Sequence, residues 1–267
     1  MNDAPIGIFD SGIGGLTVAH ALFECVPHES TIYFGDTARV PYGPKSPATV
    51  RRYSLEILDW LLGQKVKAVV VACNTSSAHA LETLQQQSRV PVIGVIEPGA
   101  RAALEAATRG GPIGVIGTAG TVASGAYPRA IRNIDPAAEV TQVACPLVVP
   151  LVEEGWFNHP AAELIAKEYL RPLMTAGIDS LVLGCTHYPL LKPLLSWVLG
   201  DEVVLIDSAD ETARTVRTVL ADLGLEASPK SRADHRFVVS DDEQRFLDVG
   251  SRFVGERLTH VEVATLG

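Results

Sequence analysis

Short apolar segments alternate with longer amphipathic stretches along this chain of 267 residues. Apolar runs of four or five residues predict strands at 6–9, 31–34, 68–72, 92–96, 113–116, 140–144, 180–183 and 203–206. Apolar residues at helical spacing predict helices at 16–23, 50–62, 76–87, 119–131, 161–175 and 209–223. The tail, 235–263, is predicted to form a strand, a helix and a strand. Because strands that alternate with helices build mostly parallel sheets covered on both faces, we expect an α/β fold.

Two signatures recur in the second half of the chain in the same order. The segment 6–12 resembles the segment 113–119 at an offset of 107 residues, and Cys73 corresponds to Cys185 at an offset of 112. For either match alone, chance similarity between buried strands is an alternative, but the two together favour an internal duplication. We therefore expect two pseudo-symmetric open parallel-sheet domains that face each other across a cleft.

Composition and charge exclude several classes of protein. The net charge is 22 − 31 = −9 and no basic cluster is longer than Arg51-Arg52, so no nucleic-acid surface is expected. Apolar runs such as 146–152 are too short to cross a membrane, and the start of the chain shows no secretory signal. We therefore expect a cytoplasmic protein whose four cysteines stay free thiols.

The two corresponding cysteines both follow a predicted buried strand. In 69–73 and in 181–185, branched apolar residues end at a small residue, and the cysteine comes next. Strand ends of open α/β sheets are where these folds place ligand sites, so we expect two thiols on opposite walls of one cleft. This arrangement suits a two-base reaction, in which one thiolate removes a proton from a carbon and the other thiol returns one to the opposite face. A reference pKa of about 8.5 makes thiol and thiolate both accessible near neutrality.

Each thiol has a candidate helper. Asp10 ends the first predicted strand and is expected beside Cys73 at the same sheet edge, and His187 follows Cys185 by two residues. These helpers are not repeated in the other half of the chain: Gly117 corresponds to Asp10, and Thr75 corresponds to His187. Two structural alternatives stay open: Asp10 as a helix N-cap, and His187 as a satisfied core histidine.

Hydroxyl and amide residues follow several predicted strands, at turns where free N–H groups and the helix dipole favour a carboxylate. These candidate donors are Ser11, Asn74, Thr75, Thr118, Thr121 and Thr186. The loop 35–44 is rich in proline and glycine and is a candidate cap over the cleft.

Several motifs follow one another in order along the chain: FDSGIGGLT (9–17), YFGD (33–36), VPYG (40–43), ACNT (72–75), GTAGT (117–121), VEEG (152–155) and GCTHYP (184–189). The resemblance to the glutamate racemase family that these motifs carry extends along nearly the whole chain. It implies two α/β domains joined by a chain crossover, the first formed by 1–97 plus 208–267 and the second by 98–207. It also implies a cofactor-independent interconversion of L- and D-glutamate that supplies D-glutamate for peptidoglycan.

The resemblance also implies roles for individual residues. Cys73, assisted by Asp10, would take the α-proton from the D isomer, and Cys185, assisted by His187, would take it from the L isomer. The residues implied in substrate binding are Asp10, Ser11, Pro41, Tyr42, Gly43, Cys73, Asn74, Thr75, Thr118, Thr121, Cys185, Thr186 and His187. Asp36 and Glu153 are possible auxiliary residues. We expect no metal, no cofactor and no membrane or nucleic-acid partner, and we expect a homodimer.

Other interpretations of these residues and of the whole chain stay open. Tyr42 could simply pack beneath its loop, and Glu153 could lie in a solvated turn. The ligand types of Cys73, Asp10, Cys185 and His187 would also suit a metal site. For the whole chain, a two-thiol enzyme acting on aspartate and a non-catalytic amino-acid-binding module are the competing functions. Pocket length would separate aspartate from glutamate, and the pair of thiols counts against the binding module.

Overall fold

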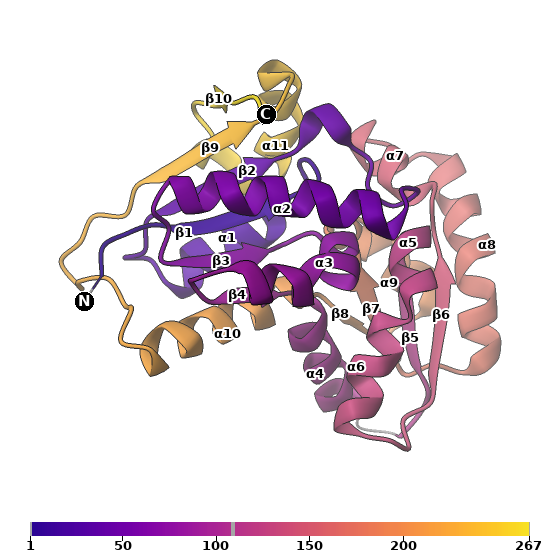
Figure 1. Ribbon diagram of the computed structural model, residues 1–267. Helices are drawn as coiled ribbons and strands as arrows, with labels where there is room; N and C mark the ends of the chain where they lie inside the picture. Colours follow the sequence, from indigo (N-terminus) through magenta and orange to yellow (C-terminus); the bar gives the residue numbers. More distant parts are fainter. Residues whose placement is uncertain (1, 108–109, 267) are drawn as a thin grey trace.

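The computed structural model describes residues 2–107 and 110–266, which form two parallel sheets in separate lobes (Figure 1). The first sheet has the strand order β10-β9-β2-β1-β3-β4. Its strands are β1 (Ile6–Asp10), β2 (Thr31–Gly35), β3 (Ala68–Val71), β4 (Val92–Gly94), β9 (His235–Val239) and β10 (Glu262–Val263). The second sheet has the order β6-β5-β7-β8. Its strands are β5 (Ile113–Gly117), β6 (Val140–Ala144), β7 (Ser180–Gly184) and β8 (Val204–Ile206). The expected α/β fold class is confirmed.

Helices cover both faces of each sheet, as parallel sheets require. On the first sheet, α2 (Pro47–Gly63) and α3 (Asn74–Gln87) pack on one face. The other face carries α1 (Leu16–Cys25), α10 (Ser208–Asp222) and α11 (Glu243–Val254). On the second sheet, α4 (Ile96–Ala106) and α6 (Ala126–Ile134) oppose α7 (Val148–Glu153), α8 (Pro160–Ala176) and α9 (Lys192–Leu199). The short α5 (Ala119–Ser124) and the 3₁₀ turns η1 (Thr37–Arg39), η2 (Tyr188–Leu191) and η3 (Gly255–Arg257) complete the elements.

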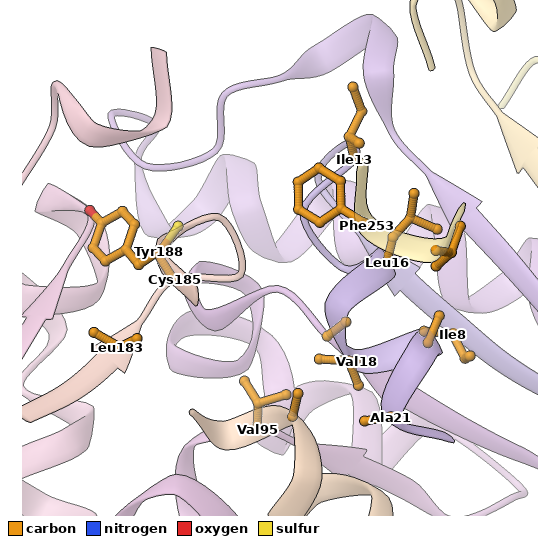
Figure 2. Packing of buried hydrophobic residues seen from close by; sticks show 14 of the residues in the cluster. Ile8, Ile13, Leu16, Val18, Ala21, Val95, Leu183, Cys185, Tyr188 and Phe253 are labelled. Carbon is orange, nitrogen blue, oxygen red and sulfur yellow. The ribbon is translucent and has the colours of Figure 1, made fainter. Parts of the chain in front are cut away.

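Strand residues alternate between the two helix layers. On β1, Ile6 and Ile8 pack towards α1 and α10, whereas Phe9 packs towards α2 and α3. One apolar cluster extends from the first sheet to residues of the second. Figure 2 shows part of it, with Leu183 on β7, and Cys185 and Tyr188 on the segment that follows this strand.

The two sheets share one topology. In each, the first four strands in chain order are arranged 2-1-3-4, giving β2-β1-β3-β4 and β6-β5-β7-β8. The repeat at 6–12 and 113–119 falls on β1 and β5, which occupy the same place in the two sheets. This shared order is what an internal duplication produces.

The structure differs from the sequence prediction around Gly125 and around the start of α4. The helix expected at 119–131 is broken at Gly125, which adopts a left-handed conformation (φ +64°) and separates α5 from α6. The strand expected at 92–96 ends at Gly94, and α4 begins at Ile96. Pro98 lies in the first turn of α4, where a missing N–H costs nothing.

No helix in the described part of the chain is long and apolar enough to span a membrane.

Candidate active site

The candidate residues lie at the carboxyl ends of the central strands of both sheets. Asp10 ends β1, and Cys73 follows the neighbouring β3, where Phe9 pairs with Val71. In the second sheet Cys185 directly follows β7, the neighbour of β5. These are the positions between the first and third strands where open α/β sheets bind their ligands.

Cys73 is buried, and its side chain caps the N-terminus of a helix. Its Sγ accepts the N–H of Ser76 at 3.5 Å as the N-cap of α3, and it lies 3.7 Å from Oγ of Ser11. Burial and the charge of Asp10 raise the pKa of the Cys73 thiol to about 11. This thiol is therefore held in its protonated form at neutral pH.

Cys185 begins a chain of polar contacts that ends at the surface. Its Sγ lies 3.9 Å from Nδ1 of His187, whose Nε2 lies 3.1 Å from Oε1 of Glu153. Oε2 of Glu153 in turn accepts from Arg245 on α11 at 3.3 Å, which joins the two lobes.

The imidazole in this chain is held in its charged form. Burial by itself lowers the pKa of His187, but the contacts with Cys185 and Glu153 and the charge of Asp10 outweigh it and raise the pKa to about 10. Burial raises the pKa of Glu153, yet the hydrogen bond from His187 and the charge of Arg245 leave it lower than usual. Cys185 therefore faces an imidazolium.

Asp10 contacts both halves of the site. It is fully buried, and its Oδ2 accepts the N–H of Gly12 at 2.9 Å while its Oδ1 accepts from Oγ1 of Thr186 at 3.3 Å. Burial raises the pKa of Asp10 against the opposing charge of His187. The alternative of a helix N-cap is wrong, because α1 begins after Gly15.

Three threonine hydroxyls form a cluster across the boundary between the lobes. Oγ1 of Thr75 lies 2.9 Å from Oγ1 of Thr118 and 3.3 Å from Oγ1 of Thr121, and the latter two are 3.0 Å apart. Thr118 caps α5, as expected of a residue at a strand-to-helix turn. The structure thus brings together three of the candidate donors.

The side chains of the loop 35–44 hold the loop in place beside the site. Tyr42 is buried against Val50 and Cys73 and donates its hydroxyl to Asp36, which also accepts from Arg39 and Ser240. Burial, followed by the charge of Asp36, raises the pKa of Tyr42. Tyr42 does pack beneath its loop, so only its backbone is free to meet a ligand, and the carboxylate of Asp36 fastens the loop.

A cavity of about 330 Å³ opens between the lobes beside this loop. It is lined by Pro41, Gly43, Thr118, Pro150, Glu153 and Arg245, among others. Cys73 and Cys185 lie deeper and are only 5% and 6% exposed. The cavity is therefore the mouth of the cleft.

Two residues absent from the sequence predictions touch this site. A Cβ at Gly14 would collide with Oγ1 of Thr186 and with the His187 ring, so only glycine fits where the β1–α1 loop meets the second lobe. Tyr127 on α6 donates its hydroxyl to Oδ1 of Asn74 at 2.7 Å. The position of Gly14 within a glycine-rich motif is a signal in the sequence, whereas nothing around Tyr127 distinguishes it from a core tyrosine.

The described residues contain no group of three or more His, Cys, Asp or Glu side chains placed to hold a metal ion.

The sequence and the structure are both similar to those of known proteins. A family model described as Asp/Glu/Hydantoin racemase matches residues 14–216. The glutamate racemase of Geobacter metallireducens is 55% identical over 98% of this chain and 96% of its own length. The crystal structure of a glutamate racemase from Bacillus anthracis superposes with a TM-score of 0.94 at 39% identity, covering 100% of this chain and 98% of that one. The glutamate racemase of Francisella tularensis, solved in complex with D-glutamate, gives a TM-score of 0.93 at 38% identity over 100% and 99% of the two chains.

Proposed function

Since the chain belongs to the Asp/Glu/hydantoin racemase family, we propose that this amino-acid racemase interconverts L- and D-glutamate by two-base proton transfer between Cys73 and Cys185, without a cofactor. The observation that carries the proposal is the equivalent placement of the two thiols. Each follows the third strand of a 2-1-3-4 sheet, and the sheets belong to lobes that share one cleft.

The proposed reaction is balanced in protons. With L-glutamate, the thiolate of Cys185 takes the α-proton on one face and the thiol of Cys73 gives its proton to the other face. The products are D-glutamate, a Cys185 thiol and a Cys73 thiolate; the reverse reaction exchanges these roles. The surroundings support this assignment, because burial with Asp10 favours a Cys73 thiol and the charged His187 lies beside Cys185.

The carbanion formed between these steps needs donors that are already in place. An α-carbon is a far weaker acid than a thiol, so the substrate carboxylate must be stabilised as negative charge develops on it. In our proposal the hydroxyls of Thr75, Thr118 and Thr121 and the amide of Asn74 supply hydrogen bonds. Asn74, Thr75 and Thr121 are buried, which favours the reaction, because hydrogen bonds to charge are stronger away from water.

The test is isotope exchange in D₂O. Wild-type protein is incubated with L-glutamate, and separately with L-aspartate, while optical rotation and α-deuterium are followed by NMR. Loss of rotation with deuterium uptake on glutamate alone is expected. Aspartate turnover at a comparable rate, or no turnover of either, would contradict the assigned substrate.

Single substitutions test the two-base mechanism. Cys73→Ala and Cys185→Ala are each expected to lower the rate of racemisation by at least about a thousandfold, because each removes one proton carrier. Cys25→Ser, on the last turn of α1, is the matched control and should leave the rate unchanged. Normal turnover in either alanine variant would sink the mechanism.

The proposal extends to cellular role and assembly. D-Glutamate formed by this enzyme would enter peptidoglycan precursors in the cytoplasm, so expression of the gene should rescue growth of a bacterium that requires D-glutamate. We also propose domains formed by 1–97 plus 208–267 and by 98–207, each holding one sheet, and a homodimer. Light scattering during size-exclusion chromatography would reveal a monomer if the dimer is wrong.

A further inference from the structure

Tyr127 lies where the two halves of the proposed active site meet. Its side chain is fully buried on α6 in the second lobe, and its ring packs against the backbone beside Cys185: a Cβ at Gly184 would come within 3.0 Å of it. Its hydroxyl donates to Oδ1 of Asn74, the residue after Cys73, at 2.7 Å. One side chain therefore contacts the neighbours of both thiols.

The hydroxyl also lies where the chain crosses between the lobes. The chain leaves the first sheet through α4 and returns through α10. A Cβ at Gly99 on α4 would lie 3.1 Å from Cβ of Ser208 at the start of α10 and 3.4 Å from the Tyr127 hydroxyl oxygen. The two crossovers thus touch at this phenol, and they fix its position relative to both sheets.

The hydrogen bond decides what Asn74 offers to a ligand. An amide side chain has one acceptor oxygen and one NH₂ donor group. Burial, assisted by the charge of Cys185 and opposed by a hydrogen bond with Ser208, raises the pKa of Tyr127, so its O–H stays a donor at every pH of interest. Because Oδ1 is turned towards this donor, the NH₂ group is the edge of Asn74 that points away from Tyr127, and it suits a carboxylate and not an ammonium group.

We propose that Tyr127 is a positioning residue that holds Oδ1 of Asn74 and so presents the Asn74 NH₂ group to the substrate carboxylate. This inference rests on the proposed function and adds a residue to it. Tyr127 itself need not touch the substrate, since its effect passes through Asn74.

A double-mutant cycle tests the proposal. Tyr127→Phe keeps the ring that packs on Gly184 and removes only the hydroxyl, so the variant should fold. We expect its KM for glutamate to rise about tenfold with a smaller change in kcat, because the freed Asn74 amide can rotate. In an Asn74→Ala background the same substitution should change kcat/KM by less than about twofold, since the residue it acts through is gone.

Tyr188→Phe is the matched control. It removes another fully buried phenol, which donates to the carbonyl of Cys145 at 2.9 Å and forms no hydrogen bond with Asn74 among the described residues. Its effects on kcat/KM should multiply with those of Asn74→Ala, and melting temperatures should show a similar loss of stability for both phenylalanine variants.

Three outcomes distinguish a failure of the positioning role from a failure of the proposed function. Loss of the Tyr127→Phe effect in the Asn74→Ala background supports the positioning role. If the wild type is active and the effects of Tyr127→Phe and Asn74→Ala on kcat/KM multiply, the positioning role of Tyr127 is wrong but the proposed function stands. A wild type inert towards both glutamate and aspartate overturns the proposed function and this role with it.

Discussion

At the residue scale, the two thiols share a position but not an environment. Cys73 lies beside a buried carboxylate, whereas Cys185 lies beside an imidazolium that is held by Glu153. A neighbouring negative charge raises the pKa of the Cys73 thiol, so this group is kept as a thiol. The two thiols therefore meet different electrostatic surroundings within one cleft.

The raised pKa of His187 predicts a pH-dependent contribution to stability. Because the folded-state pKa is about 10 and the unfolded value is about 6.5, the contribution is complete below the lower value and is lost as pH rises towards the upper one. The gap in melting temperature between wild type and His187→Gln should therefore narrow from pH 6.5 to pH 10. His28→Gln, which changes an exposed histidine, should show a small and constant gap. A His187→Gln gap that is constant or widens with pH would contradict the charged state assigned here.

Residue roles were predictable from sequence only where a local motif carried them. Cys73 and Cys185 were located because an apolar run delivers each to a strand end, and the structure places both there. The contact between Asp10 and Thr186 joins residues 176 positions apart. No spacing rule predicts such a contact, because it depends on how the lobes dock.

At the element scale, the loop between β1 and α1 joins the first lobe to the second. Gly14 lies against Thr186 and His187, and the hydroxyl of Thr17 is 3.4 Å from the carbonyl of Thr186. The side chains of Thr186 and His187 approach this backbone so closely that no side chain fits at Gly14. This short loop therefore sets the distance between the two halves of the site.

Gly14→Ala is expected to lower the free energy of unfolding by about 1–3 kcal/mol, because the new methyl group forces Thr186 and His187 to move. The rate of racemisation should fall as well, and urea unfolding together with the kinetic assay checks both. Gly63→Ala is the control: a Cβ there meets nothing within 4 Å, at the end of α2. Its stability should stay within about 1 kcal/mol of wild type or rise. Equal effects of the two substitutions would show that the close approach at Gly14 is unimportant.

Elements with strong periodicity were predictable, and short or mixed ones were not. All eight strands expected before residue 207 are present, with ends shifted by at most a few residues, and the tail forms β9, α11 and β10 as expected. The helices α4, α7 and α9 were missed. The first has a proline in its opening turn, the second is a six-residue apolar segment, and the third has eight residues, so none carries a long polar-apolar period.

At the scale of the whole molecule, the structure is a closed state of the cleft. Both thiols are almost inaccessible, although the mouth between the lobes is open to the cavity beside Pro41 and Glu153. We therefore expect a substrate as large as glutamate to reach them only after one lobe moves away from the other, so that turnover includes an opening step.

Thiol labelling measures that opening. With an aromatic disulfide reagent and mass spectrometry, half-buried Cys25 should react first, and Cys73 and Cys185 only as the lobes separate. Saturating D-glutamate should slow labelling of these two thiols by at least about tenfold, since the ligand binds the closed form. Labelling of Cys25 serves as the internal control and should not respond. Rates at Cys73 and Cys185 that ignore glutamate would contradict a binding cleft at this place.

The strand order of the first sheet bears on how the chain is synthesised. Residues of the second sheet are contiguous, whereas β9 and β10, which complete one side of the first sheet beside β2, come from the last part of the sequence. When synthesis has passed the end of β8, every strand of the second sheet has been made. At that stage β2 of the first sheet still has an unpaired edge, because β9 has not yet been made. Such an edge is open to pairing with other nascent chains. The second lobe is thus able to fold during translation, and the first is finished only near its end.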